Sequence, residues 1–238
     1  MGDVTLVLRD VREEAQDTKS FVFDAEGLAG ATAGQYLIVK LDAPTDPRRG
    51  NRSFTMANAP TEDRVTITTR MRITSPFKGK LASLAPGDRL AAKGPFGKFV
   101  LHDGDAPALF LAGGIGVTPF RSMIRHAIDT GQTLDMTLLT SDRVPEAIPF
   151  REELEKLAEE RRWFRLGRTV TRPDRSEAPW SGRIARIDGP WIEEHIRDAA
   201  RVVAYICGPP AFVEAMQTHV QSIGVSDDRI RVEPFIGY

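Results

Sequence analysis

The sequence predicts an N-terminal antiparallel β-barrel followed by a C-terminal α/β domain with a parallel sheet. Roughly the first hundred residues form short β-type runs separated by Gly, Pro and Asp, which is typical of barrels and sandwiches. The remaining residues alternate short apolar runs with helical stretches, which indicates a parallel sheet with helices on its faces. The polar stretch His102–Pro107 has the composition of a linker. The predicted domains are therefore residues 1–103 and 104–238.

The barrel is expected to contain six short strands rich in Val, Ile, Thr, Phe and Tyr. These strands are Val4–Val11, Lys19–Phe23, Tyr36–Leu41, Arg52–Met56, Val65–Arg70 and Arg89–Lys93. A short helix is expected at Pro76–Leu84, because Ser75 is a good N-cap and Pro76 suits the first helical turn.

The second domain begins with Ala108–Ala112, a continuous apolar run typical of a strand that is buried on both faces. Further strands are expected at Leu134–Thr140, Phe164–Thr171, Val202–Ile206 and Ile230–Val232. Helices are expected at Pro119–Thr130, Phe150–Arg162, Trp191–Arg197 and Pro210–Ile223. Such alternation predicts βαβ units in one parallel sheet.

The composition excludes several classes of protein. With 32 basic and 33 acidic residues the net charge is −1, so the chain has no broad electrostatic attraction for nucleic acid or an anionic membrane. Cys207 is the only cysteine, which rules out an internal disulfide and leaves too few thiolates for an iron–sulfur cluster. The four histidines show no metal-ligand spacing. The sequence shows no signal peptide or membrane span, so a cytoplasmic location is expected.

The most informative motif is LFLAGGIGVTPF at residues 109–120. A predicted strand runs into Gly113, Gly114 and Gly116, and a helix is expected to start at Thr118–Pro119 with Thr118 as its cap. Glycines let the backbone approach a bulky anion, and the free N–H groups at a helix start favour a pyrophosphate. Because Pro119 replaces the third glycine of the Rossmann pattern, a tight strand–helix corner is the alternative interpretation.

A second motif, AYICGPP at residues 204–210, also ends a predicted strand, and Pro209 and Pro210 begin a helix. Open α/β sheets bind ligands at the carboxyl ends of their strands. Cys207 and Gly208 are therefore expected to face the same crevice as Gly114–Gly116. The alternative interpretation is that Cys207 is a small buried hydrophobic residue.

Two stretches of the barrel contain candidate anion-binding groups. In RSFT at residues 52–55, alternation puts Arg52 and Phe54 on one face of a strand and the two hydroxyl residues on the other. In SPFK at residues 75–78, the free N–H groups of a helix start lie one turn from Lys78. The alternatives are an ordinary barrel strand and a capped surface helix with a solvated lysine.

The order of RSFT, a capped helix start, GPFG at residues 94–97, AGGIGVTPF and CGPP resembles the ferredoxin–NADP reductase-like flavoprotein reductases. The resemblance spans nearly the whole chain. It implies a barrel that binds FAD, with FMN less favoured, and an α/β domain that takes NADH or NADPH as substrate.

The resemblance assigns roles in flavin binding to residues of the barrel. Arg52 would pair with flavin phosphate, Phe54 would pack against the isoalloxazine, and the Thr55 hydroxyl would lie near flavin N5. Phe54 stands where relatives have tyrosine, so stacking is kept and a phenol hydrogen bond is lost. The other expected flavin contacts are Ser53, Thr69, Arg70, Met71, Ser75, Phe77 and Lys78.

In the second domain the resemblance implies that the glycine-rich turn holds the dinucleotide and that Cys207 approaches the nicotinamide. The expected contacts are Gly113, Gly114, Gly116, Thr118, Pro119, Cys207, Gly208 and Pro209. Phe235 or Tyr238 would shield the flavin, and Glu233 would assist near the nicotinamide. Ser141, Arg143 and Arg172 are candidates for the 2′-phosphate of NADPH, which leaves the choice between NADH and NADPH open.

The predicted activity is hydride transfer from NAD(P)H to bound flavin, with Thr55, Cys207 and Glu233 as the catalytic candidates. The electrons would then pass to a separate transient partner such as a ferredoxin, a flavodoxin or an oxygenase component. Two alternatives remain open: a reductase of diffusible free flavin, and a flavin-binding electron-transfer or redox-sensing subunit that does not turn over alone. A phosphate anchor at Ser75–Lys78 argues against the first.

Overall fold

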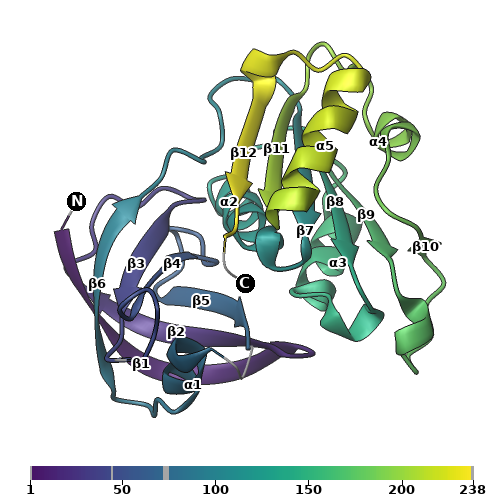
Figure 1. Ribbon diagram of the computed structural model, residues 1–238. Coiled ribbons are helices and arrows are strands. Elements are labelled where there is room, and N and C mark those ends of the chain that lie inside the picture. The colour runs from purple at the N-terminus through teal and green to yellow at the C-terminus, as the bar shows by residue number, and fades with distance from the viewer. Residues whose placement is uncertain (1, 44, 72–74, 237–238) are drawn as a thin grey trace.

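The computed structural model describes residues 2–43, 45–71 and 75–236. Its first half is a curled sheet with the strand order β4-β3-β6-β1-β2-β5, in which every neighbouring pair is antiparallel (Figure 1). The strands are β1 (Gly2–Ala15), β2 (Thr18–Glu26), β3 (Tyr36–Lys40), β4 (Asn51–Thr55), β5 (Val65–Arg70) and β6 (Arg89–Phe96). A bridge between Met56 and Ile67 joins the two edges of the sheet. The predicted barrel is thereby confirmed.

Strand β1 is longer than expected because it pairs with two partners. Its first residues pair with β6, and the segment from Thr5 to Ala15 pairs with β2. Two register shifts in the β1–β2 pairing bend the ribbon, as β-bulges do. The end of this hairpin reaches the second domain, where the Glu14 carboxylate accepts a hydrogen bond from the Phe150 backbone at 3.0 Å.

Helix α1 (Pro76–Ala82) closes one end of the barrel and begins as predicted. The Ser75 hydroxyl accepts a hydrogen bond from the Lys78 backbone N–H, and Pro76 occupies the first turn. Phe77 and Leu81 are fully buried in the barrel core beside Phe54. The cap thus fixes where the helix starts, and its apolar residues fix which side faces the barrel.

The second half is a parallel sheet with the order β10-β9-β8-β7-β11-β12. Its strands are β7 (Ala108–Gly113), β8 (Met136–Asp142), β9 (Phe164–Val170), β10 (Arg183–Ile184), β11 (Val203–Gly208) and β12 (Ile230–Pro234). Its helices are α2 (Thr118–Asp129), α3 (Arg151–Glu160), α4 (Gly189–His195) and α5 (Pro210–Ser222). Two separate apolar cores, one with α2 and α3 and the other with α4 and α5, cover the two faces. The two-residue strand β10 was not predicted, because it is too short to show periodicity.

The two halves are held together by a half-buried arginine of α2. The Arg121 guanidinium pairs with Glu62 of the barrel and with Glu153 of α3, the latter at 2.8 Å, and donates to the Ala57 carbonyl at 3.1 Å. Nearby, the Ser122 hydroxyl donates to a carbonyl of the barrel. These contacts fix how the parallel sheet faces the barrel, and therefore fix the crevice between them.

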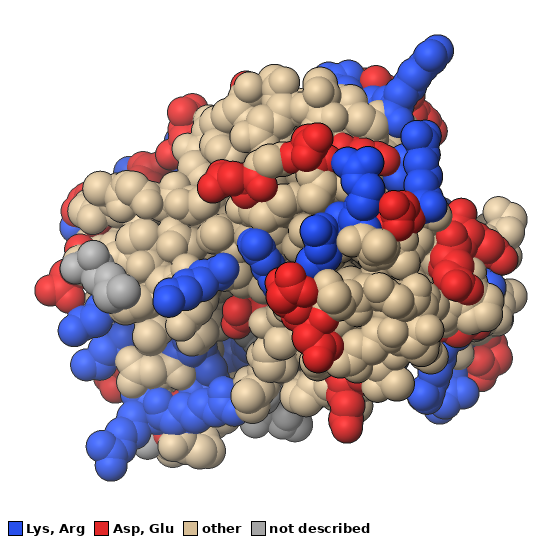
Figure 2. All heavy atoms as spheres, turned by 90° about the horizontal axis from the view of Figure 1, so that it is seen from above, with Lys and Arg blue, Asp and Glu red and all other residues tan. Residues whose placement is uncertain are grey.

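The surface matches the near-zero net charge of −1. On the face shown in Figure 2, basic and acidic side chains are interspersed over most of the area. None of the helices in the described part of the chain is long and apolar enough to cross a bilayer.

Candidate functional site

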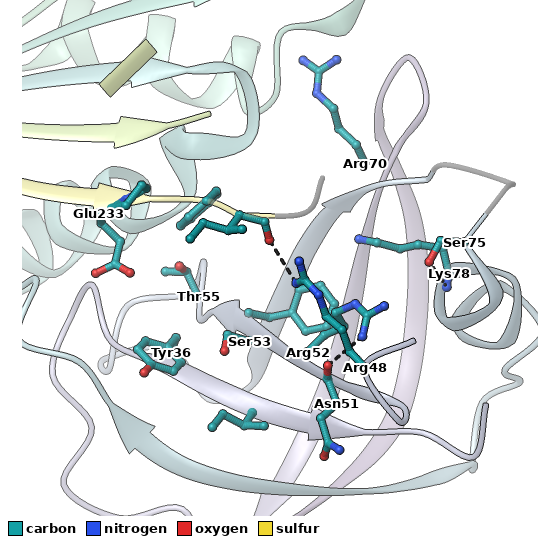
Figure 3. A pocket seen from close by; sticks show the side chains of 15 residues that line it. Tyr36, Arg48, Asn51, Arg52, Ser53, Thr55, Arg70, Ser75, Lys78 and Glu233 are labelled. Carbon is teal, nitrogen blue, oxygen red and sulfur yellow. Dashed lines mark hydrogen bonds between the residues drawn. The ribbon is translucent and has the colours of Figure 1, made fainter. Parts of the chain in front are cut away.

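A cavity of about 460 Å³ lies between the barrel and the C-terminal segment (Figure 3). Its walls come from β3, β4, the end of β5, the start of α1 and the chain around and beyond the end of β12. The lining residues are Tyr36, Ile38, Arg48, Asn51, Arg52, Ser53, Phe54, Thr55, Arg70, Ser75, Lys78, Glu233, Pro234, Phe235 and Ile236. The cavity therefore joins the two candidate anion-binding stretches of the barrel with the end of the chain.

The register of β3 against β4 builds one wall. Tyr36 pairs with Thr55 and Ile38 with Ser53, so these side chains face the cavity together. The Phe54 side chain points to the other side of β4, where its ring lies 5.8 Å from the Phe77 ring in the barrel core. Phe54 is 4% exposed, so it supports the wall from the side of the barrel core while still lining the cavity.

The two ends of the cavity differ in chemistry. Figure 3 shows Tyr36, Ser53 and Thr55 at one end near Glu233, and Arg48, Arg52 and Lys78 at the other. The first end offers hydroxyl groups and an aromatic ring, and the second offers positive charge. Such a cavity suits an elongated ligand with a ring system at one end and phosphate at the other.

Arg52 is oriented by a buried carboxylate, Asp46. The carboxylate pairs with the Arg52 guanidinium and accepts hydrogen bonds from the backbone N–H groups of Arg48 at 3.1 Å and Gly50 at 3.0 Å. The Arg52 guanidinium holds the pKa of Asp46 below its usual value. Because Asp46 fixes both the loop and the arginine, the guanidinium is held in place at the wall of the cavity.

Lys78 is buried at the cationic end. Its ammonium donates a hydrogen bond to the Thr69 hydroxyl and lies 5.0 Å from the centre of the Phe54 ring. The sequence offered a solvated lysine as the alternative, and the structure excludes it, since Lys78 is 6% exposed. Thr69 does not line the cavity and contacts it through Lys78.

Arg70 links the cavity to the second domain. It lines the cavity from the end of β5, and its guanidinium lies 3.2 Å from the Asp142 carboxylate at the end of β8. A Cβ atom placed on Gly114 would lie 3.1 Å from the Arg70 guanidinium. The arginine of the barrel therefore rests beside the glycine-rich turn.

Two of the three glycines in that turn are needed for packing. A Cβ on Gly113 would lie 2.8 Å from the Phe212 ring, and a Cβ on Gly116 would lie 2.3 Å from the Cys207 carbonyl oxygen. Gly114 has a φ of 56°, in the left-handed region that glycine adopts without strain. Of these three, Gly114 is the one whose absent side chain leaves room beside a cationic group.

The predicted cap of the following helix was wrong. A 3₁₀ helix occupies Gly114–Val117, and α2 starts at Thr118 with Val117 in the cap position. The Thr118 hydroxyl donates to the Ile115 carbonyl at 3.0 Å and accepts no cap hydrogen bond. The extra turn begins at Gly114, inside the glycine motif, so the helical path starts five residues before the predicted helix at Pro119–Thr130.

Cys207 and Glu233 are neighbours at the carboxyl ends of β11 and β12. Cys207 is fully buried, and burial together with the nearby Glu233 carboxylate raises the pKa of its thiol. Burial also raises the pKa of Glu233, which lines the cavity. The thiol is therefore a neutral packing group at the base of the crevice, as the alternative interpretation expected.

The end of the chain continues β12 into the cavity. The Phe235 backbone donates to the Gly208 carbonyl at 2.8 Å, and the Arg48 guanidinium donates to the Ile236 carbonyl at 3.2 Å. Phe235 lines the cavity, and its place over a flavin stays a prediction. Tyr238 lies outside the described residues.

The structure brings together most of the predicted barrel contacts and separates a few. Phe77 and Met71 pack against the barrel core and do not line the cavity. Ser141, Arg143 and Arg172 lie at the ends of β8 and β9, away from the cavity lining. Sequence reasoning missed Tyr36, Ile38, Arg48, Asn51, Pro234 and Ile236. The alternation of the strand at Tyr36–Leu41 was the available signal for the first two.

Both halves of the chain match families of known description. Residues 5–101 match "Oxidoreductase FAD-binding domain", and residues 110–218 match "Oxidoreductase NAD-binding domain". The ferredoxin--NADP reductase B of Sorangium cellulosum is 32% identical over 206 residues, covering 86% of this chain and 77% of that protein. This chain belongs to the ferredoxin–NADP reductase-like flavoprotein reductases. As a member of this family it is an oxidoreductase that binds FAD and a nicotinamide dinucleotide.

Two other similar proteins are longer than this chain. The glycine betaine monooxygenase reductase subunit of Chromohalobacter salexigens is 29% identical over 233 residues, covering 94% of this chain and 62% of that protein. The chain therefore spans less than two thirds of that relative. A crystal structure of the Amycolatopsis cytochrome P450 reductase GcoB superposes with a TM-score of 0.84 at 25% identity, covering 98% of this chain and 70% of that one.

The cavity of this flavoprotein reductase fits the cofactor of its family. A volume of about 460 Å³ lies within the usual range for small-molecule sites. The cations at one end suit the phosphates of FAD, and the hydroxyl groups beside Tyr36 at the other suit the edge of an isoalloxazine. The residues present are therefore compatible with FAD.

Proposed function

We propose that this protein takes a hydride from NAD(P)H onto FAD and passes the electrons to a separate protein. The observation that supports this most is the position of the cavity. Its hydroxyl-lined end lies against the carboxyl end of β12, the strand that pairs with β11, and a ligand of a parallel sheet is expected at such an edge. A flavin ring in the cavity and a nicotinamide at the sheet would then meet face to face.

Residues of the barrel would hold the flavin. Arg52, kept in position by Asp46, and Lys78, kept by Thr69, would neutralise the phosphates, with Ser75 at the start of α1. The Thr55 hydroxyl would hydrogen-bond the ring edge near N5, and Phe54 would support the ring from behind. FAD, when bound, supplies a hydride acceptor that can release electrons one at a time. The side chains supply orientation and charge, and need no proton relay for that step.

Residues of the second domain would hold the dinucleotide. The backbone at Gly114 would approach its phosphates, with the Arg70 guanidinium on the other side. Cys207 and Gly208 would form the floor under the nicotinamide, beside Glu233. Phe235 would cover the flavin ring until the nicotinamide displaces it, which keeps water off the ring in between.

Arg143 and Arg172 are the groups that would read the 2′-phosphate of NADPH. The Arg172 backbone donates to the Arg143 carbonyl at 2.8 Å, so the two side chains start from adjacent points at the ends of neighbouring strands, and both are exposed. Two exposed guanidinium groups beside Ser141 suit a dianionic phosphate. NADPH is therefore the proposed donor.

The acceptor is proposed to be a separate protein with a one-electron centre. The one cysteine of the chain cannot hold an iron–sulfur cluster. The two relatives named above as reductases of a monooxygenase and of a cytochrome P450 make an oxygenase component or a ferredoxin the first candidate. The flavin-binding and dinucleotide-binding parts are proposed to divide between residues 103 and 104.

A steady-state comparison of acceptors tests this proposal. With NADPH as donor, we expect a ferredoxin or the one-electron acceptor ferricyanide to be reduced without added flavin. Saturable dependence on added free flavin, with a colourless purified protein, would instead identify a reductase of diffusible flavin. A yellow protein that neither NADH nor NADPH reduces would identify a binding subunit and overturn the proposal.

A further inference from the structure

Asp142 is a buried carboxylate that reaches across the junction between the domains. Its side chain is 1% exposed at the end of β8, and Oδ1 lies 3.2 Å from the Arg70 guanidinium of the barrel. The backbone of Asp142 is held in place, because its carbonyl accepts hydrogen bonds from the Thr171 N–H at 3.0 Å and the Thr171 hydroxyl at 3.2 Å. The backbone position of Asp142 at the crevice therefore does not depend on Arg70.

The charged groups that face Asp142 are Arg70 from β5 and Arg168 from β9. Arg168 is already engaged, because its guanidinium pairs with Glu155 of α3 at 2.7 Å. Two residues before Asp142 on β8, the Thr140 hydroxyl is buried without a hydrogen-bond partner among the described residues. Burial outweighs the two arginines and raises the pKa of the Asp142 carboxyl to about 7. The Asp142 carboxyl thus changes charge close to neutral pH. Its ion pair with Arg70 is the contact that this change weakens or strengthens.

Arg70 also lies where the dinucleotide phosphates are expected. Its guanidinium would touch a Cβ on Gly114 at 3.1 Å, so an anion at that backbone would lie against the same guanidinium. A charged Asp142 and a phosphate bound at Gly114 would then compete for the Arg70 guanidinium. Two anions at one poorly solvated cation repel each other, so one of them must leave or take up a proton.

We propose that Asp142 is a positioning residue that holds Arg70 beside Gly114 in the free protein, and that a proton on Asp142 frees Arg70 for the phosphates of the dinucleotide. Dinucleotide affinity then rises as the pH falls from 8 to 6. This inference rests on the proposed dinucleotide site at the glycine-rich turn. It concerns the Asp142 carboxylate, which lies outside the motifs at residues 109–120 and 204–210.

The test is the dissociation constant of NAD⁺ for the flavin-loaded protein, followed by the change it causes in the flavin absorption bands. NAD⁺ is the probe because its two phosphates keep their charge between pH 6 and 8. Asp142→Asn imitates the protonated carboxyl with the same shape. We expect it to tighten NAD⁺ binding about fivefold at pH 8, and by less than about twofold at pH 6.

Three further variants complete the design. Arg70→Ala should weaken NAD⁺ binding about tenfold, and in that background Asp142→Asn should change nothing, because the group it acts through is absent. Arg70→Lys should restore part of the affinity. Asp135→Asn is the matched control: this carboxylate lies next to the opposite end of β8 and pairs with Arg165, so its loss should leave NAD⁺ affinity unchanged at both pH values.

The outcomes separate this inference from the proposed function. If NADH and NADPH both fail to reduce the wild-type flavin, the proposed function fails. If the flavin is reduced but Asp142→Asn binds NAD⁺ like the wild type at pH 8, the inference alone is wrong. An equal effect of Asp142→Asn at pH 6 and pH 8 would also overturn it, because a merely structural change would not depend on the titration of the carboxyl.

Discussion

The barrel wall and the glycine-rich turn both face the crevice between the domains, but they are built by different means. In the barrel wall the groups that meet an anion are side chains, each held by a neighbour: Arg52 by Asp46 and Lys78 by Thr69. In the turn only Gly114 is partly exposed, and Gly113 and Gly116 are glycines because other side chains and backbone fill the space. This difference predicts that a substitution in the barrel wall mainly lowers the affinity for FAD, whereas a substitution at Gly113 or Gly116 in the turn mainly lowers the free energy of unfolding.

The largest effect is expected for Gly116→Ala. The new methyl group would lie 2.3 Å from the Cys207 carbonyl oxygen, and a backbone atom in a buried strand cannot move aside cheaply. We expect the free energy of unfolding to fall by about 3 kcal/mol, at the upper end for overpacking. Urea denaturation followed by circular dichroism measures this.

Gly79→Ala is the matched control, because a Cβ there meets no atom within 4 Å and the residue lies in helix α1. Its expected effect is a gain of up to about 1 kcal/mol from helix propensity. If Gly116→Ala unfolds at the wild-type urea concentration, the glycine is not there for packing and the contrast between the two regions fails.

The next effect is a loss of flavin in Arg52→Ala. Removing a guanidinium that pairs with phosphate should raise the dissociation constant of FAD at least about tenfold, or about 1.4 kcal/mol. Flavin content after gel filtration and fluorescence titration of the apoprotein measure it. Arg89→Ala, which removes an exposed arginine paired with Glu26, is the control. Wild-type flavin retention in Arg52→Ala would contradict the role of the wall.

Much of this organisation can be predicted from local sequence. The strand Val65–Arg70 was predicted with its exact bounds, because alternation and flanking turns mark both ends. The Ser75 cap was correct, since a cap depends on residues within one turn. Tyr36 and Arg48 were missed because their place in the cavity depends on the β3–β4 register and on a loop held by Asp46. The contact of Arg70 with Asp142 depends on how two domains dock, which no local pattern encodes.

A smaller effect is expected at the end of the chain, where the two regions touch. Arg48→Ala removes the hydrogen bond to the Ile236 carbonyl, so Phe235 should leave the flavin more easily. We expect the KM for NADPH to fall about two- to threefold, which is the size of an exposed charged contact. Steady-state kinetics with ferricyanide measures this. An increased KM would mean that Arg48 meets the dinucleotide and does not restrain the tail.

The smallest effect concerns the linker between the two regions. The Nε2 of His102 lies 2.8 Å from the Ala106 carbonyl and must donate to it, so Nδ1 accepts from the Tyr205 hydroxyl at 2.9 Å. Burial lowers the pKa of His102, and Arg231 lowers it further. The neutral ring is therefore favoured in the folded state, and its stabilisation is present above the unfolded pKa of about 6.5 and lost as the pH falls below it.

His102→Gln should consequently show a smaller drop in the urea midpoint between pH 7.5 and pH 5.5 than the wild type. Denaturation curves at the two pH values measure the difference. Equal drops in both proteins would show that the histidine does not titrate against this network.

The central claim is that a flavin in the barrel and a nicotinamide at the parallel sheet meet in one crevice. An anaerobic titration of the FAD-loaded protein with NADPH and with NADH, followed at the flavin absorption bands, tests it most directly. We predict that the bands bleach with one equivalent of NADPH per flavin. Bands that neither nicotinamide changes, in a protein that has kept its FAD, would contradict the account.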